Sequence, residues 1–120
     1  MDPVRINLFK YRGVNSSLYT GRPQGEDARL DCKLNEMDSK GIKVVFIIPI
    51  GTSSFNPSFY LGLLFDSIKF YGVDKYEQYY SFEIVDQNPD IIQVLKDNLE
   101  DGKRYAINTI LNKTGFQRFL

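Results

Sequence analysis

Hydrophobic and polar positions alternate with the period of a β-strand in two parts of the chain. Residues 4–11 read VRINLFKY and residues 80–85 read YSFEIV, so that every second side chain is apolar over most of each stretch. Residues 42–50, IKVVFIIPI, are instead apolar almost throughout. This pattern is typical of a central strand buried on both faces. A short return strand is also predicted at residues 17–19.

Helical patterns fall between these strands. Residues 20–41, TGRPQGEDARLDCKLNEMDSKG, have an early proline, apolar side chains at helical spacing and a final glycine, which predicts one amphipathic helix. Residues 88–102 begin with Asn-Pro and predict a second helix, and another is predicted at 103–112. We expect residues 113–120 to form a frayed or docked tail.

Strands and helices alternate in this order, which favours an α/β domain with at least one parallel pair of strands. With 120 residues and no flexible linker in the middle, the chain is expected to fold as a single domain, residues 1–120. We expect a mixed sheet of four to five strands packed with about four helices.

One predicted helix, over residues 57–71, is apolar on nearly every side. It lies in the stretch SSFNPSFYLGLLFDSIKFYG, residues 53–72. At about 100° per residue, its small or polar side chains fall within an arc of roughly 80°. This strip consists of Ser58, Gly62, Asp66 and Lys69. It is either the solvated face of a helix that packs on the sheet, or a contact face for a partner.

The aromatic side chains beside the strip favour the second interpretation. Phe59 and Phe65 border it, and so narrow a strip leaves little room for both of them and Tyr60 to pack on one sheet. We therefore expect an exposed apolar patch, of the kind that marks partner surfaces. The strip would then supply polar contacts, and Phe59 or Phe65 an apolar anchor.

Composition narrows the chemistry that the chain can perform. It has no histidine and a single cysteine, Cys32, which excludes Ser-His-Asp and Cys-His arrangements, the usual zinc sites and an internal disulfide. Fifteen basic residues balance fifteen acidic ones, so no overall charge attracts nucleic acid or an anionic membrane. No secretion signal opens the sequence, so we expect a cytoplasmic protein. We expect no cofactor, no metal and no catalytic residue.

A second hypothesis places a ligand site in the loops after the central strand. In open α/β sheets, ligands bind beyond the carboxyl ends of the strands. Thr52, Ser53 and Ser54 are available there, and Arg22 could hold a carboxylate or phosphate at two points. The chain would then be a nucleotide- or ligand-binding domain or a small enzyme. A third hypothesis is self-association through the apolar helix, which would make the protein a homo-oligomer.

Two segments resemble the STAS domains, named for sulfate transporters and anti-sigma factor antagonists. Residues 55–64, FNPSFYLGLL, follow a buried strand and a short loop and are similar to an apolar helix start in that family. Residues 16–34, SSLYTGRPQGEDARLDCKL, are similar to the segment that leads into the first helix in a STAS-like branch. The resemblance runs from about Asn15 to Leu111 and implies a STAS-like fold.

The resemblance also implies a function. STAS antagonists are non-enzymatic switches that bind an ATP-binding regulatory kinase of the anti-sigma type, which phosphorylates a serine at the helix start. In this chain Phe59 occupies that serine position and Pro57 replaces the family's aspartate, so Ser58 is the nearest candidate phosphoacceptor. We expect a regulatory or adaptor domain that binds a protein partner through the helix at 57–71 and its adjoining loops.

Overall fold

The strands form two small parallel sheets instead of the single mixed sheet expected from the sequence. The computed structural model describes residues 2–13 and 15–118, with the burial of side chains described as far as residue 112. One sheet has the order β1-β3-β5, and the other pairs β2 with β4. The strands are β1 (Val4–Asn7), β2 (Leu18–Tyr19), β3 (Val44–Ile48), β4 (Ser54–Phe55) and β5 (Tyr80–Ile84). Every pairing is parallel because a helix, and not a tight turn, lies between the paired strands in the chain.

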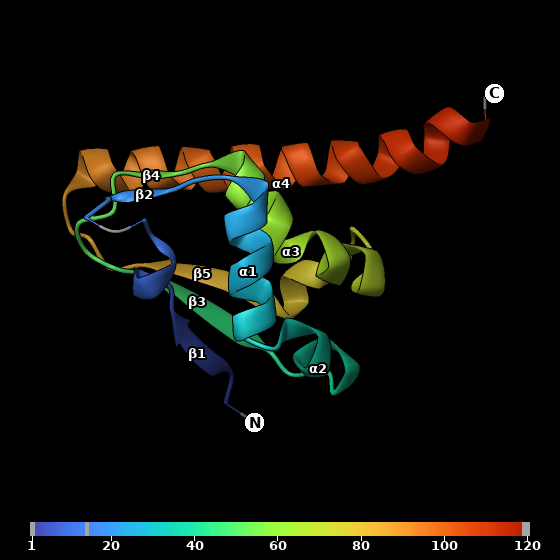
Figure 1. Ribbon diagram of the computed structural model, residues 1–120, viewed down its shortest axis with the longest axis horizontal. Helices are drawn as coiled ribbons and strands as arrows, with labels where there is room; N and C mark the ends of the chain where they lie inside the picture. The colour runs from blue at the N-terminus through green and yellow to red at the C-terminus, as the bar shows by residue number, and fades with distance from the viewer. Residues whose placement is uncertain (1, 14, 119–120) are drawn as a thin grey trace.

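Four α-helices occur within the described residues, which confirms the predicted α/β class. They are α1 (Arg22–Asp31), α2 (Leu34–Ser39), α3 (Pro57–Tyr71) and α4 (Pro89–Arg118). Two 3-10 helices lie in the connections: η1 (Phe9–Tyr11) follows β1, and η2 (Tyr76–Gln78) precedes β5. In Figure 1, α4 runs along the top, the sheet β1-β3-β5 lies below, and α1 and α3 fill the space between.

The larger sheet has one covered face and one open face. Val44, Phe46 and Ile48 of β3 are buried, whereas Val45 and Ile47, which point the other way, are only partly buried. The prediction that this strand is buried on both faces is therefore wrong. The sequential order β1-β3-β5 puts both crossovers on the same face because parallel crossovers are right-handed.

The helix predicted at 20–41 is two helices. α1 ends at Asp31, Lys33 adopts a left-handed conformation with φ 57°, and α2 begins at Leu34. The change of direction turns both Leu34 and Asp38 into the core, where they are buried. No glycine or proline marks this break, and the apolar pattern runs through it without interruption.

The helices predicted at 88–102 and 103–112 form one helix of 30 residues, α4. Gly102 does not end it: a Cβ atom there would lie 2.6 Å from the Tyr60 ring, so the glycine permits close contact between α4 and α3. Asn98 Oδ1 accepts a hydrogen bond of 2.8 Å from the backbone of β4. The backbone stays helical through residue 118, in place of the expected tail, and residues 119–120 lie outside the described residues.

The Asn-Pro helix starts are confirmed. Asn56 Oδ1 accepts a hydrogen bond of 2.7 Å from the backbone N–H of Ser58 at the start of α3. Asn88 Oδ1 accepts one of 2.9 Å from Asp90 at the start of α4. Each asparagine thus satisfies a donor that the helix itself leaves without a partner.

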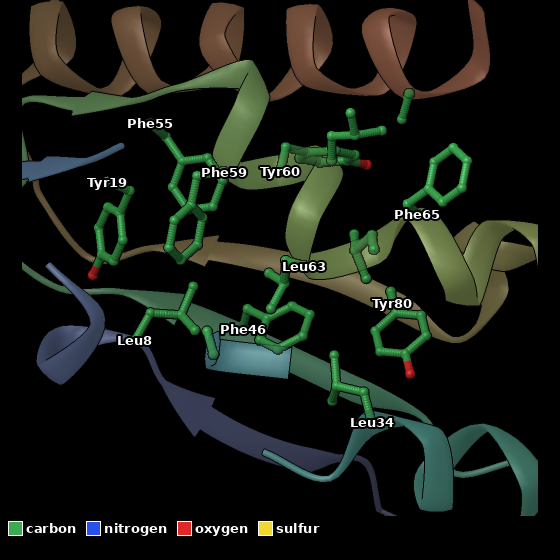
Figure 2. Packing of buried hydrophobic residues seen from close by; sticks show 14 of the residues in the cluster. Leu8, Tyr19, Leu34, Phe46, Phe55, Phe59, Tyr60, Leu63, Phe65 and Tyr80 are labelled. Atoms are coloured by element: carbon green, nitrogen blue, oxygen red, sulfur yellow. The ribbon is translucent and has the colours of Figure 1, made fainter. Parts of the chain in front are cut away.

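The apolar composition of α3 follows from its central position. α1 packs on one side of it and α4 on another, and its Tyr60 ring stacks on Phe82 of β5 in the sheet. Figure 2 shows Leu63 directed toward Phe46 of β3, while Tyr60 lies on the side nearest α4. A helix that is apolar all round is expected where neighbours cover it all round.

Candidate functional site

The carboxyl ends of β1, β3 and β5 lie side by side along one edge of the sheet, at the left in Figure 1. Three of the residues just beyond these ends are apolar and exposed: Phe9 (61%), Ile50 (66%) and Val85 (43%). Backbone hydrogen bonds between the neighbouring strands continue up to this edge and fix the strand ends relative to each other. We call Phe9, Ile50 and Val85 the carboxyl-edge rim.

Arg12 is a charged residue at this edge, beside Phe9. Its Nη1 donates a hydrogen bond of 3.3 Å to Thr52 Oγ1, and its Cζ lies 4.8 Å from the centre of the Phe9 ring. Every other arginine in residues 2–13 and 15–112 has a carboxylate oxygen within 4.0 Å, whereas Arg12 has none. A partly buried guanidinium is thus held in place by a hydroxyl and a ring, with its charge unmatched by a carboxylate.

Tyr19 of β2 is the buried tyrosine next to the segment that carries Ser17. The Tyr19 ring is fully buried and packs on Phe55 and Phe59 at centroid distances of 5.0 and 5.1 Å, and Figure 2 shows its hydroxyl directed away from those rings. The hydroxyl makes no short, well-aligned hydrogen bond with the described residues, and the Thr52 side chain is a hydrogen-bonding neighbour at longer range. Burial raises the pKa of Tyr19 to about 12, although the neighbouring Arg12 and Thr52 oppose the rise. It is therefore a protonated donor at neutral pH.

The loop residues predicted from the sequence do meet at this edge. Thr52 is buried, and its Oγ1 donates a hydrogen bond of 2.8 Å to Pro49 O while it accepts the one from Arg12. Ser53 Oγ lies 2.6 Å from Ser17 Oγ, and Ser54 belongs to β4. These contacts fix the loop after β3 against the segment before β2.

Arg22, predicted to join these loop residues, contacts other side chains. It is the first residue of α1, where its Nε lies 3.6 Å from Glu26 Oε2 and its Cζ lies 5.1 Å from the centre of the Phe65 ring. Arg12 is the arginine that reaches Thr52. Sequence reasoning missed it because η1 folds the chain back after β1, and no residue spacing reports a contact across 40 positions.

The strip predicted on the helix at 57–71 is divided between accessible and buried positions. Ser58 is partly buried in the first turn, and Asp66 and Lys69 are exposed with their charged atoms 3.8 Å apart. Gly62 is buried where α1 crosses α3. The strip is therefore not one continuous contact face, because α1 covers its middle.

Phe59, Tyr60 and Phe65 are all buried, so the expectation that they form an exposed apolar patch is wrong. Phe65 lies beneath two cations: the Arg22 guanidinium is 5.1 Å and the Lys69 ammonium 4.7 Å from the centre of its ring. The prediction considered burial against a single sheet. Two further helices cover the sides of α3 that a sheet would leave exposed.

A buried polar cluster near the amino ends of β3 and β5 was not foreseen. Arg29 donates hydrogen bonds to Ser67 Oγ at 2.7 Å and to Asp38 Oδ2 at 3.0 Å, and Tyr80 donates to the other oxygen of Asp38. Burial, followed by the hydrogen bond to Asp38, raises the pKa of Tyr80. The cluster links α1, α2, α3 and β5. Because these groups mostly satisfy one another, we interpret the cluster as structural.

Two further findings concern metals and membranes. Within the part of the chain that the structure describes, no group of three or more Cys, Asp or Glu is arranged to hold a metal ion. The helices found there are too short or too polar to span a lipid bilayer.

Comparison with models of known protein families found no match, and comparisons with curated proteins and with solved structures found no significant match. What the structure itself shows is an α/β fold built on two parallel sheets. The function is therefore argued from the geometry of the carboxyl edge.

Proposed function

We propose that this chain is a regulatory or adaptor domain that binds a protein partner at the carboxyl-edge rim. The exposure of Phe9, Ile50 and Val85 just beyond the ends of adjacent strands, with Arg12 stacked on Phe9, carries the proposal. Apolar side chains exposed together mark interaction surfaces, and aromatic and arginine side chains provide much of the binding energy at such surfaces.

The side chains and loop of the rim are already ordered in the protein without a partner. The stacking of Arg12 on Phe9 restricts both side chains, and the contacts of Ser53 with Ser17 restrict the loop that carries Ile50. A surface that is already ordered loses less conformational entropy on binding, so more of the contact energy appears as affinity.

The earlier hypothesis of a contact face on the helix at 57–71 is retained in part. Its adjoining loop belongs to the carboxyl edge, and Ser58, Asp66 and Lys69 are the members of the strip that a partner could touch. The STAS-like identity, which rests on the resemblance of residues 16–34 and 55–64, is part of the proposal. It suggests an ATP-binding regulatory kinase as the partner class, with Ser58 as the phosphoacceptor.

Two exposed phenylalanines allow a matched test. Phe9 lies on the rim and is 61% exposed, whereas Phe70 lies at the end of α3 and is 59% exposed. Partners recovered from native cells with the tagged chain would be identified by mass spectrometry, and intact mass would show any phosphate on Ser58. Affinity for the purified partner should fall about tenfold or more for Phe9→Ala and hardly change for Phe70→Ala. Equal affinities of the two variants and the unaltered chain would contradict the proposal.

A further inference from the structure

β5 forms one edge of the larger sheet, where β3 is its neighbour on one side. Tyr79 O accepts a hydrogen bond of 2.7 Å from β3 at one end of the strand, and Val85 N donates one of 3.2 Å to β3 at the other. Alternate residues of a strand direct their backbone groups to the same side, so the odd-numbered residues between these ends bond β3. The N–H and C=O groups directed away from β3 are those of Tyr80, Phe82 and Ile84.

This outer edge of β5 is open. Its backbone groups have no hydrogen-bond partner among residues 2–13 and 15–118. Proteins usually protect such an edge with a proline, a bulge or a covering segment, because an unpaired edge pairs readily with another chain. β5 contains no proline, and its register with β3 runs through all five residues without a bulge. In the smaller sheet, by contrast, Asn98 of α4 accepts a hydrogen bond from the backbone N–H of Phe55 in β4.

A groove of about 370 Å³ lies between this edge and α4. Residues 80–82 of β5 and one face of α4 line it, together with Glu77 and Tyr60. The rings of Tyr60 and Phe82 stack at a centroid distance of 5.7 Å, and Leu99 of α4 adds a further apolar side chain to the lining. In Figure 1, β5 and α4 both run lengthwise through the molecule. A strand laid along β5 would therefore also lie along α4. We call this hollow the β5–α4 groove.

The α4 wall of the groove carries two charges whose spacing suits a strand. Lys96 and Glu100 line the groove and form no ion pair within the part of the chain that the structure describes, whereas Lys103 is paired with Glu77 at 2.7 Å. Residues four apart on a helix are separated by about 6 Å along its axis, and residues two apart on a strand by about 6.6 Å. An acidic and a basic side chain two positions apart on an extended peptide would therefore match Lys96 and Glu100.

We propose that the β5–α4 groove binds an extended segment of a partner protein, which adds to the sheet as a further strand beside β5. The open backbone groups of β5 would hold the main chain of this segment, and an apolar side chain of the segment would cover Leu99. A glutamate and a lysine two positions apart would pair with Lys96 and Glu100. The site goes beyond the proposed function and does not depend on it, because it lies along β5 and not at the carboxyl-edge rim.

The test uses a synthetic peptide of about seven residues, in which threonine alternates with valine, glutamate and lysine in that order. Titrated into the 15N-labelled chain, it should give saturable shifts of the amide signals of β5. The amide hydrogens of Phe82 and Ile84 should exchange with solvent about tenfold or more slowly at saturation, because they become hydrogen-bonded. The absence of saturation at millimolar peptide, or unchanged exchange at these two amides, would overturn the proposal.

Methylation of the peptide's backbone nitrogens separates main-chain pairing from side-chain contacts. Every second N–H group of a bound strand faces β5, and the others face away. One peptide would be methylated on the first alternate set of nitrogens and another on the second set. We expect one of the two to lose about tenfold or more in affinity and the other to bind as the unmodified peptide does. Equal affinities of the two methylated peptides would overturn strand addition.

Variants of α4 locate the site. Leu99→Ala should weaken peptide binding about fivefold, and Lys96→Glu, which repels the peptide's glutamate, about threefold. Val94→Ala is the matched control, because Val94 is an exposed apolar residue of the same helix outside the groove lining. Phe9→Ala at the rim should also leave peptide binding unchanged, which separates this site from the proposed function. Circular dichroism checks that each variant is folded. Unaltered affinity in folded Leu99→Ala and Lys96→Glu would overturn the assignment of the groove.

Discussion

Gly25 of α1 and Gly62 of α3 face the backbone of each other's helix where the two helices cross. A Cβ atom on Gly25 would lie 2.3 Å from Phe59 O, and one on Gly62 would lie 2.2 Å from Arg22 O. No side chain separates the helices at this point. Glycine is required there for close approach, because both residues have helical backbone geometry that alanine would also adopt.

Alanine at this crossing should destabilise the protein. In an ordinary helix, replacing glycine by alanine stabilises by about 1 kcal/mol. Here the added methyl group meets rigid backbone, so we expect Gly62→Ala and Gly25→Ala each to cost about 2–3 kcal/mol in urea unfolding. The double variant should cost less than the sum, because separation of the helices by one methyl group makes room for the other. An unchanged urea midpoint for both single variants would contradict the close crossing.

Removal of Arg29 should be far more costly than removal of a surface arginine. Arg29→Ala leaves the buried Asp38 carboxylate without its cation, which we expect to cost about 3–5 kcal/mol. Arg104→Ala is the control, because its pair with Asp101 at 2.5 Å is exposed and should cost less than about 1 kcal/mol. Chemical unfolding measures both. Equal losses would show that Asp38 does not depend on Arg29.

Lys33 offers a stabilising substitution. It is exposed and has φ 57°, a conformation that costs a non-glycine residue about 1 kcal/mol. We expect Lys33→Gly to raise the free energy of unfolding by about 0.5–1 kcal/mol and therefore to raise Tm. Lys40→Gly, at φ −98°, should lower Tm instead, because no strain is relieved there. A lower Tm for Lys33→Gly would contradict the left-handed junction.

Stability should depend on pH through Asp31. Hydrogen bonds first from Lys10 and then from Tyr11 lower the pKa of the Asp31 carboxyl below its ordinary value of 3.8. Since the folded pKa is the lower one, the contribution is fully present above 3.8 and is lost as pH falls through the folded pKa. We expect Asp31→Asn to have a lower Tm than the unaltered chain at neutral pH, and the two Tm values to converge in acid. A difference that stays constant with pH would contradict this linkage.

The sequence predicts local features of this fold better than its long-range contacts. The Asn-Pro helix starts at Asn56 and Asn88 and the apolar strand β3 depend on neighbouring residues, and all are found. The junction at Lys33 could not be predicted from local sequence. The left-handed conformation of this lysine is compensated by the burial of Leu34 and Asp38 in α2. The helix end predicted at Gly102 is wrong for a similar reason. Glycine occurs there because the Tyr60 ring of α3 packs against the backbone of α4.

The candidate site shows the same limit. Thr52 and Ser53 lie in the loop after β3, as expected, whereas a role for them in binding stays a prediction. The arginine assigned to that loop was Arg22, whereas Arg12 occupies the position, because η1 places it there. Arg29 and Asp38 could not be paired either: nine positions apart in a continuous helix, they would point about 180° apart.

The position of α4 determines when this protein can fold during its synthesis. α4 is the last described element to leave the ribosome, and it completes the cover of Tyr60 and the backbone pairing of Phe55. Until then the nascent chain carries its most apolar helix partly uncovered. A chain stalled before residue 89 should therefore attract chaperones and proteases that recognise exposed apolar segments, although it already contains every strand of both sheets.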